Sequence, residues 1–294
     1  MQLAQGDPNA DEDEFVGSVG APNVPFRVAV SGLTSNGSPY HRIFPPIFGP
    51  PPLIYPGGAV NAASFAPGAP VAPGSIVAVF GAGLSLDTAQ AAATPLPTML
   101  AGARMLFDQS VAVPKFFASP SQVNIQIPWQ LSGHSEAILT DNVQGLPSDP
   151  ITVNLAPFAP GIYTTNSQGT GQGNILIAGT ASIAAPVGAF SGSRPVMRGS
   201  EYISIYCTGL GAVTNQPASG SAASASPLSQ TTTTPTVSIG GVAATVTFSG
   251  LAPGLVGLYQ VNALVPATAP IGDAVPVVLS IGTATSNTVT IAVQ

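Results

Sequence analysis

Two copies of one short motif decide the fold: Gln122-Val123-Asn124-Ile125-Gln126-Ile127-Pro128 and Gln260-Val261-Asn262-Ala263-Leu264-Val265-Pro266. In each copy apolar residues nearly alternate with polar ones, which is the pattern of a half-buried β-strand. The closing proline has no N–H to donate, so it ends the hydrogen-bond ladder of the strand. Each copy therefore predicts a strand with a defined end.

Matching blocks flank both copies in the same order. The upstream block Gly74-Ser75-Ile76-Val77-Ala78-Val79-Phe80, followed by Gly83-Leu84, corresponds to Gly199-Ser200-Glu201-Tyr202-Ile203-Ser204-Ile205-Tyr206, followed by Gly209-Leu210. The downstream block at 148–153 corresponds to 286–291. Three blocks in one order and at similar spacing indicate a duplicated module, and 294 residues are enough for two domains with separate cores.

The spacing of the strand patterns predicts an all-β protein with two tandem immunoglobulin-like β-sandwich domains, at residues 55–157 and 158–294. No window carries a sustained helical stripe. In the first domain we predict strands near 76–80, 103–107, 123–127, 137–140 and 151–155. In the second domain we predict strands near 173–177, 201–206, 236–239, 244–248, 259–264, 274–280 and 288–293.

The N-terminal part predicts an acidic flexible tail at residues 1–21, then a β-hairpin with a proline-rich connector at 22–54. Asn36-Gly37 is a strong hairpin-turn signal between the predicted strands at 25–32 and 39–44. A lone hairpin is marginally stable in water, so it needs to pack on the first sandwich, complete a domain with other strands, or pair with another chain.

Two further segments are predicted from composition. The segment Pro157–Tyr163 contains two prolines and predicts a short, semi-rigid hinge between domains placed end to end. The Ala/Ser/Thr-rich stretch Gly220–Thr234 predicts a surface loop, with glycosylation as the alternative.

Charged residues make up only 6 % of the chain, and the net charge of −6 comes mostly from five acidic residues within the first fourteen. Lys115 is the only lysine and the arginines are scattered, so no basic patch exists to bind the phosphates of a nucleic acid. The mean hydropathy is positive, yet no apolar run is long enough for a transmembrane segment. Met1–Gly6 does not resemble a signal peptide, so we expect a chain numbered after processing or a piece of a longer protein.

The side chains that could carry chemistry are few. Cys207 falls on the apolar face of a predicted strand and is expected to be a buried, inert thiol. His134 lies in Ser132-Gly133-His134-Ser135-Glu136, where a turn is favoured over a catalytic triad because triad partners converge from distant segments. No cluster of imidazole, thiolate and carboxylate groups indicates a metal or a cofactor. The sequence therefore predicts no enzyme, no catalytic residue and no cofactor.

Trp129 is the aromatic residue of greatest interest because it directly follows the proline that ends the first motif. Two alternatives stay open: Trp129 plugs the junction between the modules, or it presents an exposed face on which a sugar could stack. Burial in the core or at the junction is favoured for the aromatic residues as a group.

A set of short motifs occurs in order along the chain: Asn61-Ala62-Ala63-Ser64-Phe65, Ala72-Pro73-Gly74-Ser75, Gly81-Ala82-Gly83-Leu84, Ser119-Pro120-Ser121-Gln122-Val123-Asn124, Ala159-Pro160-Gly161-Ile162, Arg198-Gly199-Ser200-Glu201-Tyr202 and Thr208-Gly209-Leu210-Gly211. With these motifs the chain resembles the uncharacterised C-terminal domain of many secreted Solibacter-type bacterial proteins, which is related in character to TIG/immunoglobulin-like sandwiches. The resemblance covers about residues 57–294 and implies an extracellular tandem β-sandwich without assigned catalytic residues.

Charge-poor strand edges and a hairpin on a proline stem favour an extracellular or cell-surface structural protein that associates with copies of itself, as a surface or filament subunit. The alternative is an adhesion, glycan-binding or spacer module, with a cell-surface glycan as the partner. We expect neither nucleic acid nor a membrane span to be involved. The residues expected to make the contacts are Phe26, Val28, Val30, Tyr40, Ile43, Phe44 and Trp129.

Overall fold

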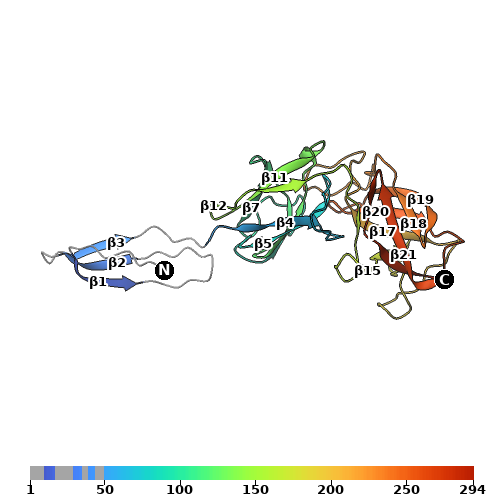
Figure 1. Ribbon diagram of the computed structural model, residues 1–294, viewed down its shortest axis with the longest axis horizontal. Coiled ribbons are helices and arrows are strands. Elements are labelled where there is room, and N and C mark those ends of the chain that lie inside the picture. The colour runs from blue at the N-terminus through green and yellow to red at the C-terminus, as the bar shows by residue number, and fades with distance from the viewer. Residues whose placement is uncertain (1–9, 17–28, 35–38, 44–49) are drawn as a thin grey trace. The chain divides into compact units, whose positions relative to one another are not determined.

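The computed structural model describes residues 10–16, 29–34, 39–43 and 50–294 (Figure 1). The chain divides into two compact units, Met1–Pro51 and Pro52–Gln294. Within the described residues the only helix is the 3-10 turn η1 (Trp129–Leu131), and no helix is long and apolar enough to cross a membrane. The predicted all-β fold with tandem immunoglobulin-like sandwiches is confirmed.

The N-terminal unit contains a three-stranded antiparallel sheet in the order β1-β2-β3. The predicted hairpin is present as β2 and β3, although its Asn-Gly turn lies outside the described residues. Part of the predicted flexible tail instead forms a strand, because its backbone pairs antiparallel with β2. The strands are β1 (Ala10–Val16), β2 (Ala29–Thr34) and β3 (Pro39–Ile43).

The first sandwich consists of two antiparallel five-stranded sheets. In the second of these sheets, β13 pairs with β11 from outside the main order. The first sheet contains, in spatial order, β4 (Leu53–Asn61), β5 (Ile76–Ala82), β10 (Gln122–Gln126), β9 (Lys115–Ser119) and β6 (Ala89–Gln90). The second contains β12 (Leu146–Pro147), β11 (Glu136–Val143), β7 (Ala103–Phe107), β8 (Val111–Ala112) and β13 (Ile151–Asn154).

The second sandwich is built from one continuous sheet of ten strands. Its long strand β19 pairs with β18 through residues 242–244 and with β20 through residues 245–251, so it passes from one layer to the other. The strands are β14 (Gly161–Ile162), β15 (Gly171–Gln172), β16 (Ile175–Ile177), β17 (Tyr202–Thr208), β18 (Thr236–Ile239), β19 (Val242–Leu251), β20 (Tyr259–Leu264), β21 (Gly272–Ile281), β22 (Ala284–Thr285) and β23 (Val289–Val293).

The repeated motifs occupy equivalent places in the two sandwiches. The first copy forms β10 between β5 and β9, and the second forms β20 between β17 and β19. One side-chain hydrogen bond is also repeated, because the amide of Gln122 donates to Asn124 Oδ1 at 2.7 Å and that of Gln260 donates to Asn262 Oδ1 at 2.8 Å. The duplication therefore extends from sequence to side-chain geometry.

The layer-crossing strand differs between the copies for a local reason. In the first sandwich it is interrupted at Pro114, which separates β8 from β9, whereas the equivalent β19 runs without a break. A proline cannot donate to the ladder, so the strand divides where it changes layers. Each sandwich has its own apolar core, and Trp129 belongs to the core of the second although its chain segment follows β10 of the first.

Candidate functional site

The structure places only some of the predicted interaction residues. Phe26, Val28 and Phe44 lie outside the described residues. Val30 lies on the central strand β2, opposite Phe15 of β1 and Arg42 of β3. Tyr40 and Ile43 lie on the outer strand β3. Both outer strands of this sheet have β2 as their sole strand partner within the described part of the chain, so each offers one backbone edge.

The burial of Trp129 decides between the two alternatives for its role, a plug at the junction or an exposed face. It is 6 % exposed and packs with the core of the second sandwich. Its six-membered ring lies so close to Gly74 that a side chain there would overlap it. Its backbone N–H donates to Ser219 Oγ of the second sandwich at 2.9 Å. Trp129 is thus a plug between the sandwiches and does not offer the exposed stacking face that the glycan-binding alternative required.

The two sandwiches are held together by hydrogen bonds from core strands. The N–H of Ile76 donates to Thr208 Oγ1 at 2.9 Å, and the same hydroxyl donates to the Gly257 carbonyl at 2.9 Å. At the end of β10, the buried side chain of Gln126 accepts a hydrogen bond through Oε1 from the N–H of Gly220 at 2.6 Å. These donors and acceptors are buried or partly buried, where an unmade hydrogen bond costs most.

The insertion in the second copy takes part in this junction. From Gly83 to Gln122 the first copy advances 39 residues, whereas the second advances 51 from Gly209 to Gln260. The extra length includes Gly220, which is buried and also accepts from the N–H of Leu96 at 2.8 Å. The start of the segment predicted as a surface loop is therefore a contact between the sandwiches, because its backbone pairs with polar groups of the first one.

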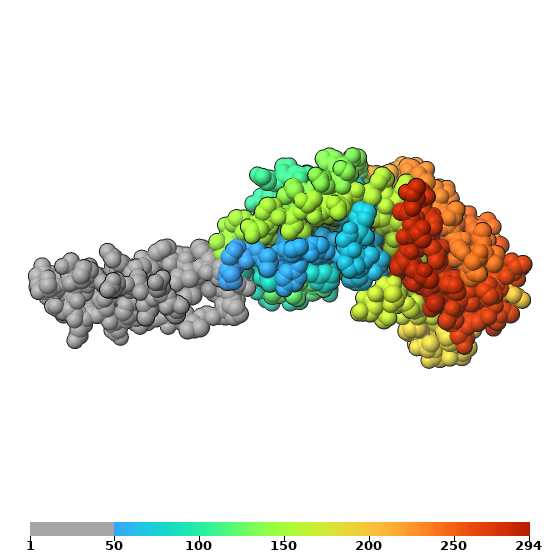
Figure 2. Space-filling model, in the orientation of Figure 1, coloured from blue at the N-terminus to red at the C-terminus, as the bar shows by residue number. Residues whose placement is uncertain are grey.

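The predicted hinge is also held on both sides. Ala159 donates its N–H to the Gly209 carbonyl at 2.9 Å, and its carbonyl accepts from Asn61 Nδ2 at 2.8 Å. Phe158 lines two clefts of about 490 and 470 Å³. In Figure 2 the cyan atoms of the first sandwich lie directly against the red C-terminal strands on the viewed face. The linker is therefore a fixed part of residues 52–294.

The core of the first sandwich contains two buried ionisable residues from opposite sheets. Lys115 begins β9 and is 0 % exposed, and Asp141 lies on β11 and is 1 % exposed. Lys115 Nζ donates to the carbonyls of Thr98 at 2.6 Å and Val113 at 3.1 Å. Asp141 Oδ1 accepts from the N–H of Asn142, whereas Oδ2 is buried without a hydrogen-bond partner. The two groups do not form an ion pair within 4.0 Å.

Burial shifts the pKa values of both groups toward neutral pH, because it disfavours their charged forms. Burial lowers the pKa of Lys115 to about 8, and the charge of Asp141 offsets part of this effect. Burial raises the pKa of Asp141 to about 7, and the charge of Lys115 again opposes it. Because desolvation is the largest cause for both residues, keeping these charges in the core costs free energy that their mutual attraction does not recover.

The second sandwich shows that the fold does not require this pair. Lys115 lies opposite Ile125 at the bulge of β9, and Val246 lies opposite Ala263 at the bulge of β19. Asp141 and Leu279 are equivalent because each backbone N–H donates to a serine hydroxyl, Ser148 or Ser286, at 3.0 Å. The second copy thus has valine and leucine where the first has lysine and aspartate. The one sequence feature that pointed to this pair is that Lys115 is the only lysine of the chain. Composition alone does not tell whether that lysine is buried or exposed.

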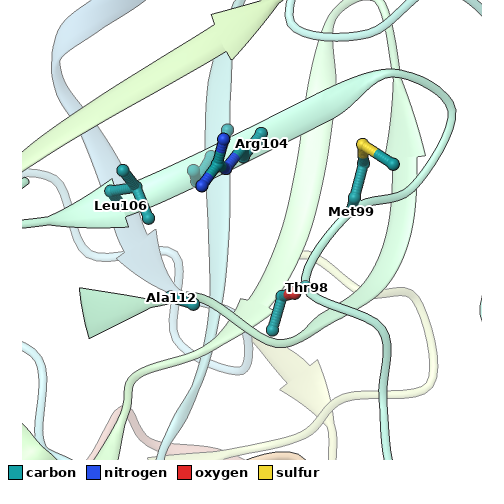
Figure 3. Close-up of a pocket in the computed structure, with 6 residues that line it drawn as sticks. Thr98, Met99, Arg104, Leu106 and Ala112 are labelled. Carbon is teal, nitrogen blue, oxygen red and sulfur yellow. The ribbon is translucent and has the colours of Figure 1, made fainter. Parts of the chain in front are cut away.

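A pocket lies near this pair, because its lining includes Arg104, whose charge acts on Lys115. It has a volume of about 290 Å³ and is lined by Thr98, Met99, Arg104, Met105, Leu106 and Ala112 (Figure 3). Thr98 connects the pocket to the core, since its carbonyl accepts from Lys115. The lining contains one charged side chain, Arg104, and one hydroxyl, that of Thr98.

His134 is exposed in the predicted turn, and no hydrogen bond joins its imidazole to a serine or carboxylate in the described part of the chain. Residues 50–294 and the described strands before them contain no cluster of three or more His, Cys, Asp and Glu residues that could hold a metal.

Cys207 is buried in the second core, as predicted, and burial raises the pKa of its thiol. Because the thiolate is the reactive form, we expect the folded protein to resist modification by a maleimide near neutral pH. Unfolding in guanidinium should restore rapid modification, and mass spectrometry after timed quenching measures both rates. Fast labelling of the folded protein would show that the second core opens readily.

No family model matches the chain, and comparison with curated protein sequences gives no significant match. Among solved structures, the match to the I9–I11 tandem of titin covers 100 % of this chain and 86 % of the titin chain, with 11 % identity and a TM-score of 0.24. The SGBP-B protein of a Bacteroides ovatus mixed-linkage glucan utilization locus, in complex with a heptasaccharide, covers 93 % of this chain with 11 % identity and a TM-score of 0.31. Domains 4–9 of the surface layer protein SbsC cover 99 % with 13 % identity and a TM-score of 0.22. This chain spans 54 % of the second structure and 40 % of the third, and similarities this low transfer no function.

Proposed function

We propose that this chain is an extracellular structural protein that associates with copies of itself. The N-terminal sheet makes the contact, and the two joined sandwiches act as a rigid spacer. The observation that carries the proposal is that β1, β2 and β3 pair only with one another within the described residues. An extracellular location follows from the resemblance to domains of secreted bacterial proteins.

The N-terminal unit is too small to be strongly stable alone. It spans 51 residues and contains no cysteine for a disulfide. A domain of about 60 residues buries only about 60 % of the surface of its unfolded chain and is marginally stable, so a partner chain, a disulfide or a metal adds stability that a still smaller domain needs. Pairing of its outer strands with another copy would supply the missing burial and the missing backbone hydrogen bonds.

The role of spacer follows from the junction. The contacts of Trp129, Thr208, Gln126 and Gly220 join the sandwiches without a free hinge. A rigid pair transmits orientation from one end to the other, as a subunit of an ordered surface structure requires. A flexible pair would instead spread the contacts over many orientations.

Deletion of residues 1–51, which leaves the unit from Pro52 to Gln294 intact, tests the proposal directly. We expect association to be lost, because the N-terminal sheet is removed, while thermal unfolding of the sandwiches is unchanged, because β4 begins at Leu53. Light scattering and electron microscopy of the intact and shortened chains measure association. Equal association of both chains, or an intact chain that stays monomeric at high concentration, would contradict the proposal.

A further inference from the structure

Charge divides unequally between the two outer strands of the N-terminal sheet. Strand β1 carries four consecutive acidic residues, Asp11 to Glu14, among its seven positions. Strand β3 carries Arg42 and His41 and no acidic residue. The sequence contains no further carboxylate side chain until Asp87. One edge of the sheet is therefore strongly acidic and the other is basic, with β2 between them.

We propose that β3 of one copy pairs edge to edge with β1 of the next copy. The inference rests on the proposed self-association and names the surfaces that carry it. Oppositely charged residues on neighbouring strands stabilise a sheet by about 0.2–1 kcal/mol per pair, and like charges destabilise it. A β1–β1 contact would bring eight carboxylates together, and a β3–β3 contact would bring two arginines together. The mixed contact avoids both.

This contact is heterologous and does not close on itself. Each added copy uses one acidic and one basic edge and leaves one of each free. Such a contact produces an open chain of subunits, whereas an isologous contact would stop at a dimer. Strand β3 has five residues, so each junction forms a short ladder.

Two charge-reversal variants of the full chain test the pairing. The edge-1 variant carries Asp11→Lys, Glu12→Lys, Asp13→Lys and Glu14→Lys. The edge-3 variant carries His41→Glu and Arg42→Glu. In either variant alone, both outer strands carry charge of the same sign. We therefore expect the protein concentration needed for assembly to rise about tenfold or more, as the reversal of two cross-strand charge pairs implies.

Mixing the two variants in equal amounts is the decisive step. Each acidic edge then meets a basic edge of the other variant, so assembly should return as an alternating copolymer. The control variant carries Glu136→Lys and Asp273→Lys, two exposed positions on the sandwiches, and should assemble like the parent. Sedimentation and negative-stain electron microscopy measure five samples: the parent, each variant alone, their mixture and the control.

The outcomes separate the inference from the proposed function. A parent chain that never associates overturns both. If the parent assembles and either variant alone assembles equally well, self-association stands but the edge pairing is overturned. If both variants fail alone and the mixture also fails, charge pairing between β1 and β3 is likewise rejected.

Discussion

Replacing Gly209 with alanine is expected to lower the free energy of unfolding of residues 52–294 by about 3–5 kcal/mol, the sum of backbone strain and overlap in a packed site. Gly209 adopts φ = +84°, a conformation that strains any residue with a Cβ. A Cβ at this position would also overlap the carbonyl oxygen of Ala159, which is backbone and cannot rotate away. The linker would have to shift, breaking the Ala159–Gly209 hydrogen bond.

The duplication supplies a matched control. Gly83 is the equivalent residue of the first sandwich and also has a positive φ, +65°, but a Cβ there meets nothing closer than 3.8 Å. Gly83→Ala should therefore cost about 1–2 kcal/mol, the strain alone. Guanidinium unfolding followed by fluorescence of Trp129, the only tryptophan, reads the junction directly. Equal costs at the two glycines would show that the junction tolerates movement of its linker.

Replacing the buried pair of the first sandwich with the residues of the second, Lys115→Val with Asp141→Leu, is expected to raise stability near neutral pH by about 1–4 kcal/mol. Apolar residues of suitable shape remove two desolvated charges, including the carboxylate oxygen without a partner. The equivalent positions in the second copy already accommodate valine and leucine. Denaturant unfolding of parent and double variant measures the difference.

The pH dependence of the parent's stability tests whether the two buried charges cause this difference. Asp141 has a folded pKa of about 7 against an ordinary 3.8, so the folded state binds the extra proton and stability falls as pH rises between these values. Lys115 has a folded pKa of about 8 against an ordinary 10.5, so the unfolded state binds the extra proton and stability rises with pH above about 8. The two groups together predict a stability minimum between about pH 7 and 8.

The double variant should lose this minimum, and its advantage should shrink toward pH 4, where Asp141 is protonated in the folded parent. The rise in stability that Lys115 causes above pH 8 should be measured below pH 9. At higher pH the raised pKa of Cys207 makes stability fall, because the thiol of the unfolded chain ionises at its ordinary pKa of 9.0. The reciprocal change, Val246→Lys with Leu279→Asp, should destabilise the second sandwich. A double variant less stable than the parent at every pH would mean that the buried pair stabilises the fold.

Strand positions and the duplication were predictable because both are local properties of the sequence. Alternation of apolar residues and a terminal proline identify β10 and β20 without knowledge of their neighbours. The same reasoning placed Cys207 on a buried face and His134 in a turn. The sequence could not place Ala10–Val16 in a strand, because four successive acidic residues have the composition of a solvated tail and pair only when β2 is beside them.

The sequence alone therefore determined that this is an all-β chain with two copies of one sandwich module and few ionic side chains. Only the tertiary structure decided that the modules share a fixed junction, that Trp129 enters the core of the second one, and that Lys115 and Asp141 share a core. Periodicity reports which face of a strand is buried, whereas the partner of that face depends on contacts between residues about 50–130 positions apart, such as Gly74 with Trp129 and Ile76 with Thr208. Such contacts arise from packing in three dimensions and leave no local pattern.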